Sequence, residues 1–179
     1  MSHFEYISVA VSLVYSLILA KLLGALPASL QRDRWYWVHS LWVVNLLLAT
    51  LGSWWEIWSY REAAWTPSGF FALVAIPSII YLRAAVLLSD QPRDVLSWRD
   101  RYYAVLRPFF ILQLVGSIHF VTAPWVISGV VRPNATLVGS AAFAALAIMA
   151  AGWRAPRLHE IVAVLAFLGY FAAFFLRLG

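Results

Sequence analysis

The stretch of sequence that decides the fold is residues 7–34, which read ISVAVSLVYSLILAKLLGALPASL and then QRDR. Its apolar part is longer than the roughly 20 residues that an α-helix needs to cross the hydrocarbon core of a bilayer. Lys21 is the one charged residue inside this part, and the charged tetrapeptide ends it. The same alternation of an apolar run and a short, arginine-bearing gap continues along the chain. We therefore predict an all-α, polytopic membrane protein.

The pattern predicts six transmembrane helices that form one bundle over residues 1–179. We expect these helices at residues 4–30, 35–60, 68–89, 102–131, 135–151 and 156–177. Proline, glycine and charged residues mark the gaps, as is typical of turns. The composition agrees, because 63% of the residues are hydrophobic and only 12% are charged, whereas soluble domains carry roughly 25% charged residues.

Arginine is shared unequally between the two ends of the predicted bundle. One end holds seven loop arginines, Arg32, Arg34, Arg93, Arg99, Arg101, Arg154 and Arg157, and the other holds three, Arg61, Arg132 and Arg177. Cytoplasmic loops are enriched in lysine and arginine, so we expect both termini outside. The short chain, rich in alanine and arginine, further indicates a multi-pass protein of the bacterial inner membrane. Because the net charge of +5 is spread over short loops, nucleic acid is not an expected partner.

Small residues recur at intervals of four along the first predicted helix: Ser8, Ser12, Ser16, Ala20, Gly24 and Ala28. Such a row forms a groove that lets a second helix backbone approach closely. The second helix could belong to the same chain, to another copy in a homo-oligomer, or to a larger membrane complex. The fifth helix is small nearly all round, from Gly139 to Ala147, and we expect it near the centre of the bundle.

Polar side chains within the apolar runs are candidate functional residues, because ionisable groups are costly in a bilayer and usually face a cavity or a partner. They lie on one face of the second helix and on the fourth helix: His39, Asn45, Glu56, Gln113, Ser117 and His119. The functional interpretation is a polar path or pocket between these two helices, with Asn45 and Gln113 near mid-membrane. The alternative is that the same groups only form hydrogen bonds between helices.

Three further cations, Lys21, Arg83 and Arg107, lie within predicted helices in the cytoplasmic half. If they face inward, they form a positively charged inner mouth suited to a small anion. The alternative is that each side chain extends to the nearby interface, where its charge stays in water while its stem lies against apolar surface.

Signals for an enzyme or a cofactor are weak, and we predict no catalytic residues, no metal site and no cofactor. The chain has no cysteine, and none of its four histidines pairs with another at a spacing of four. A haem between His39 and His159 is the remaining, unfavoured option. An intramembrane enzyme that acts on lipid would need His39 or His119 as a base, and the sequence offers no accompanying nucleophile.

Three short stretches resemble small six-helix bacterial inner-membrane proteins of uncharacterised function. They are Leu19-Ala-Lys-Leu-Leu-Gly24, Tyr81-Leu-Arg-Ala-Ala85 and Asp100-Arg-Tyr-Tyr103. The resemblance implies the fold and brings no activity. Those proteins often carry a glutamate where Lys21 stands here, so no role is transferred to this residue.

The sequence therefore favours a small membrane channel, transporter or ligand-binding bundle. Its polar path would run between the second and fourth helices, and its cationic cytoplasmic mouth would suit a small anion or a proton. The lipid bilayer is the surrounding partner in any case. The alternative is a non-catalytic accessory or assembly subunit of a larger membrane complex.

Overall fold

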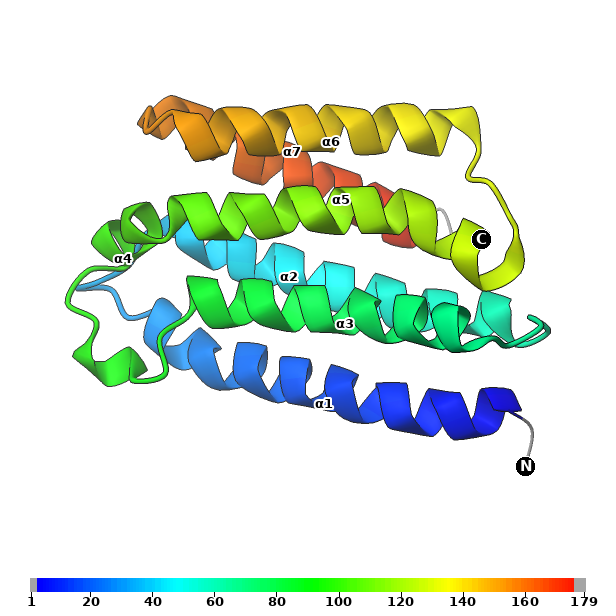
Figure 1. Cartoon of the computed structure of the whole chain (residues 1–179). Helices are drawn as coiled ribbons and strands as arrows, with labels where there is room; N and C mark the ends of the chain where they lie inside the picture. Colours follow the sequence, from blue (N-terminus) through cyan, green and yellow to red (C-terminus); the bar gives the residue numbers. More distant parts are fainter. Residues whose placement is uncertain (1–2, 176–179) are drawn as a thin grey trace.

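The computed structural model describes residues 3–175, and these residues form helices and connecting loops without a strand. The six long helices are α1 (His3–Ser29), α2 (Trp37–Glu56), α3 (Pro67–Leu87), α5 (Leu106–Ser128), α6 (Asn134–Gly152) and α7 (Pro156–Phe175). They lie side by side as a bundle, with α1 at one edge and α6 at the opposite edge (Figure 1). The shorter elements are η1 (Ile57–Tyr60), η2 (Pro92–Asp94) and α4 (Trp98–Ala104).

The helix expected at residues 102–131 is divided into α4 and α5. The break falls at Val105, whose backbone angles of φ −106° and ψ 8° are not helical. Pro108 explains it, because proline has no N–H to bond the carbonyl four residues earlier and its ring crowds that carbonyl. At the far end, Gly129 adopts a left-handed φ of 71°, which ends α5 as is common for glycine after a helix.

Five helical segments are long and apolar enough to cross a membrane: His3–Ser29, Pro67–Asp94, Leu106–Ser128, Asn134–Gly152 and Pro156–Phe175. The prediction of an all-helical protein with several helices apolar enough to cross a membrane is confirmed. The prediction of six such spans is not confirmed, because five segments qualify among the described residues. The exception is α2, which has 20 residues. Its polar residues, among them His39, Asn45, Thr50 and Glu56, lower its mean hydropathy.

The centre of the bundle is built around α2, which packs against α1, α3 and α7. Its side chains Trp42 and Leu46 are fully buried, as are Phe109 and Phe110 of α5. The expectation that the small-residue helix α6 lies at the centre is wrong. It buries only Ala147 and Ala150 among its described residues and packs against α5 and α7 at the edge.

The small-residue row of α1 lies at the margin of the bundle. The face that α1 buries is a different one, formed by Ile7, Val11, Tyr15, Ile18, Leu22, Ala25 and Ser29. Of the row itself, Ser16, Ala20 and Gly24 are exposed, while Ser8, Ser12 and Ala28 are half-buried. A Cβ atom added at Gly24 would meet no heavy atom within 4 Å. The described helices of this chain therefore do not pack closely against this small-residue row.

Candidate ligand cavity

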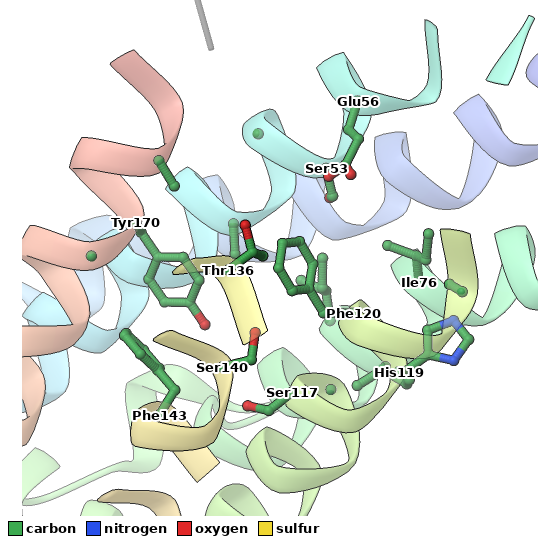
Figure 2. Close-up of a pocket in the computed structure, with 18 of the residues that line it drawn as sticks. Ser53, Glu56, Ile76, Ser117, His119, Phe120, Thr136, Ser140, Phe143 and Tyr170 are labelled. Carbon is green, nitrogen blue, oxygen red and sulfur yellow. The ribbon is translucent and has the colours of Figure 1, made fainter. Parts of the chain in front are cut away.

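A cavity of about 480 Å³ lies among α2, α3, α5, α6 and α7. It extends from Glu56, Tyr60 and Arg132, near the end of the bundle where α2 stops and α6 begins, down to Arg83 and Gln113. Figure 2 shows side chains from α2, α3, α5, α6 and α7 around this space, with the Tyr170 ring of α7 reaching into it. Its volume falls within the roughly 300–1,000 Å³ typical of small-molecule sites.

At one end the cavity is lined by an ion pair between Glu56, in the last turn of α2, and Arg132, in the loop between α5 and α6. Both side chains are largely buried, at 14% and 17% exposure. Arg132 also donates a hydrogen bond from Nε to the carbonyl oxygen of Phe120 at 3.4 Å. Its guanidinium carbon lies 4.3 Å from the centroid of the Phe120 ring. The pair thus ties α2 to the α5–α6 connection, and its two charges balance.

The wall formed by α5 and α7 is polar. Tyr170 donates a hydrogen bond from its hydroxyl to Oε1 of Gln113 at 3.3 Å, and Ser117 donates from Oγ to the carbonyl oxygen of Gln113 at 3.0 Å. Gln113 and Ser117 are one turn apart, so both fall on the same face of α5. Thr136 and Ser140, from α6, add two more hydroxyls to the lining (Figure 2).

Arg83, on α3, stands at the deep end of the cavity and is only 3% exposed. Its Nε and Nη2 atoms are buried and have no hydrogen-bond partner within residues 3–175. The guanidinium carbon lies 5.4 Å from the centroid of the Phe109 ring, a cation–π contact that compensates part of the lost hydration. A buried charge without a counter-ion is unfavourable, so this guanidinium marks the place where the cavity lacks a negative group.

The structure brings five of the predicted candidates together in this cavity: Glu56, Arg83, Gln113, Ser117 and His119. They come from α2, α3 and α5, whereas the prediction placed the path between the second and fourth helices alone. His119 contributes little polarity to the interior, because its Nε2 lies 2.8 Å from the carbonyl oxygen of Ala72 on α3. Its ring accordingly turns aside from the other labelled side chains in Figure 2.

The other four candidates lie away from the cavity. Lys21 forms an ion pair with Asp90, with Nζ and Oδ1 2.8 Å apart, and Arg107 is exposed. His39 stacks on Trp98 with ring centroids 4.4 Å apart. Asn45 donates from Nδ2 to the carbonyl oxygen of Ala163 at 3.1 Å and therefore bonds α7 instead of Gln113. The three predicted mouth cations are thus separated, and Arg83 alone faces the cavity.

Sequence reasoning missed the contributions of the last two helices and of the loop that precedes them. Tyr170, Thr136, Ser140 and Arg132 all line the cavity, and none was a predicted site residue. One sequence signal could have indicated Tyr170 as a site residue: it directly follows Gly169 inside an apolar run. A Cβ atom on Gly169 would approach Cε2 of Phe143 to 2.8 Å, so glycine is what allows the Phe143 ring to pack here.

His159, which the haem option would require, is already engaged. Its Nε2 lies 2.8 Å from the carbonyl oxygen of Trp153, and its Nδ1 lies 3.0 Å from the Tyr102 hydroxyl. Burial raises the pKa of Tyr102, which keeps that hydroxyl protonated and able to donate to Nδ1. Residues 3–175 contain no group of three or more His, Asp or Glu side chains placed to hold a metal ion.

No family model, curated protein or solved structure matches this chain. The resemblance to small six-helix bacterial proteins therefore stays a prediction, and the functional argument rests on the cavity.

Proposed function

We propose that this protein is a small integral membrane bundle that takes a small solute into the cavity between α2, α3, α5, α6 and α7, as a binding protein, transporter or channel. The observation that carries the proposal is a cavity of about 480 Å³ with polar side chains from several helices, inside a bundle whose outer helices are apolar. Polar groups at membrane depth are costly unless they face one another or a water-filled space. A cavity that admits a solute supplies that space.

In the proposed topology α2 crosses the membrane as a sixth span, and both termini lie outside a bacterial inner membrane. The support is that the polar residues His39, Asn45 and Thr50 of α2 are buried, so lipid does not contact them. The first residues of α1 and the last of α7 lie at the same end of the bundle (Figure 1). The opposite end carries the arginine-rich loops, which favour the cytoplasm.

We propose that the cavity in this orientation opens toward the outside, beside Glu56, Tyr60 and Arg132, and is closed toward the cytoplasm. Below it, the Trp42 ring meets the rings of Phe109 and Phe110 edge-on, with centroids 5.0 and 5.5 Å away. All three side chains are fully buried. This arrangement favours a binding protein or a transporter in its outward-facing state over a permanently open channel.

The second candidate function is that of a non-catalytic subunit of a larger membrane complex. The exposed small-residue row on α1, which includes Ser16, Ala20 and Gly24, favours it, since such rows commonly pack against another helix. A purely structural subunit needs no water-filled cavity, so an accessibility measurement separates the two functions.

Because the chain has no cysteine, single cysteines test the cavity directly. Ser140 lines it, whereas Thr50 is fully buried and donates from Oγ to the Leu46 carbonyl. Each lies six residues from the same end of the bundle, at the start of α6 and the end of α2, so depth is matched at about 9 Å. A membrane-impermeant methanethiosulfonate added outside should modify Ser140→Cys and leave Thr50→Cys unmodified. Equal rates would reject the proposed cavity.

A further inference from the structure

We infer that the solute is a monoanionic carboxylate with an apolar body, and that Arg83 binds its carboxylate. This inference rests on the proposed function and specifies the ligand class of the same cavity. The first argument is charge. Among the cavity-lining residues of the described chain, Glu56 and Arg132 balance each other in an ion pair, and Arg83 adds one further positive charge.

The second argument is the position of the Arg83 side chain, which lines the deep end of the cavity although it is only 3% exposed. Its guanidinium carbon lies 5.4 Å from the centroid of the Phe109 ring. Its Nε and Nη2 are buried and have no hydrogen-bond partner among the described residues. Adjacent guanidinium N–H groups are suited to bind both oxygens of one carboxylate.

The third argument is the nature of the remaining wall. Apolar side chains line the space between the guanidinium and the ion pair: Leu48, Ile76, Ile79, Phe120, Phe143 and Phe174. A small inorganic anion would leave this surface uncovered, whereas an apolar body attached to the carboxylate would fill it. A dianion such as a phosphate monoester would bring a second charge for which the cavity offers no second free cation, and burying an unpaired charge is costly.

The test measures binding of ¹⁴C-benzoate to the purified full chain in nanodiscs. Phenyl phosphate and benzyl alcohol serve as competitors that keep the ring and change the charge. An apolar carboxylate could arrive from water or from the bilayer, so ¹⁴C-palmitate is tested in parallel. We expect at least one of the two carboxylates to bind in a way that depends on Arg83. Phenyl phosphate and benzyl alcohol should compete more weakly than unlabelled benzoate.

Arg83→Met should weaken carboxylate binding by at least about 30-fold, because it removes one partner of a buried charge pair. Arg83→Lys should weaken it by about tenfold, because it keeps the charge and loses the planar fork. The matched control is Arg107→Met, which removes an exposed arginine outside the cavity and should change affinity less than about twofold. If Arg83→Met does not fold, the lysine variant and the competitor series still decide.

Equal affinity of the wild type and the folded Arg83 variants for benzoate and palmitate would overturn the inference, as would benzyl alcohol competing as well as benzoate. Failure of both carboxylates to bind while Ser140→Cys is still labelled would also reject the carboxylate, but would leave the solute cavity standing. A Ser140→Cys that resists labelling would reject the proposed function itself.

Discussion

Asn45 and Gln113 are both amides in the interior of the bundle, and their surroundings give them different tasks. Asn45 donates to the carbonyl oxygen of Ala163 and so joins α2 to α7. Gln113 accepts from the Tyr170 hydroxyl and forms part of the cavity wall. Between helices in lipid such hydrogen bonds contribute about 0.6–2 kcal/mol each, so Asn45 acts as an adhesive while Gln113 shapes the site.

At the residue scale, Glu56→Gln should lower the apparent melting temperature by about 5 °C, because it leaves the largely buried Arg132 without its balancing charge. The double variant Glu56→Gln/Arg132→Gln should recover most of the loss, since it removes both charges together. Thermal unfolding of the wild type, of the single variants Glu56→Gln and Arg132→Gln and of the double variant, followed by tryptophan fluorescence in one detergent, gives the coupling between the two residues. Additive losses in the double variant would show that the pair contributes nothing as a pair.

At the scale of the elements, α6 and α7 both border the cavity, and a few small residues decide how closely these two helices approach one another. Phe143 of α6 lies against Gly169 of α7, and its ring centroid is 5.6 Å from that of Tyr170. The small side chains of α6 therefore do not make a central helix. They leave room on its inner side, and that room belongs to the cavity.

Gly169→Ala should destabilise the protein by about 1–3 kcal/mol, because its Cβ atom would overlap the Phe143 ring and force a packed side chain to move. Gly152→Ala is the matched control, since a Cβ atom there meets nothing within 4 Å. Its effect should stay within about 0.5 kcal/mol. Chemical denaturation of both variants checks the difference, and an equally stable Gly169→Ala would show that the Phe143 contact is loose.

At the scale of the whole molecule, the charged ends set the proposed orientation, and the cavity makes the two ends of the bundle different. The arginine-rich end is tied together by its own loops, as Arg34 donates to the carbonyl oxygen of Val95 at 2.9 Å and Arg101 donates to that of Leu88 at 2.8 Å. The other end holds the Glu56–Arg132 pair above the cavity. Such an asymmetric bundle is suited to take up a solute from one side.

The proposed topology predicts that Gln31 and Glu62, which are both exposed and flank α2, lie on opposite sides of the membrane. A membrane-impermeant maleimide should label Glu62→Cys in intact cells and Gln31→Cys only in inverted vesicles. Because α2 alone and the short η1 separate these positions, the pair reports whether α2 crosses. Labelling of both positions from the same side would exclude a sixth span.

The amino-acid sequence by itself determined the helices of this protein and its membrane character. Long apolar runs lose water favourably in lipid, and within lipid only a helix satisfies their backbone polar groups. Both effects are local, so they can be evaluated residue by residue along the chain. The same local reasoning found that Glu56, Arg83 and Gln113 are too polar to face lipid.

Only the tertiary structure decided which of these polar groups meet. The long helices are apolar on several faces, so composition does not specify which face each one buries, and lipid provides no hydrophobic drive between helices to choose it. The buried face of each helix is instead decided by how the side chains of neighbouring helices pack. The small-residue row containing Gly24 lies at the margin, Asn45 bonds α7, and Lys21 is paired with Asp90. Arg83 is thereby left without a carboxylate partner among the described residues, because Glu56, which also lines the cavity, is paired with Arg132.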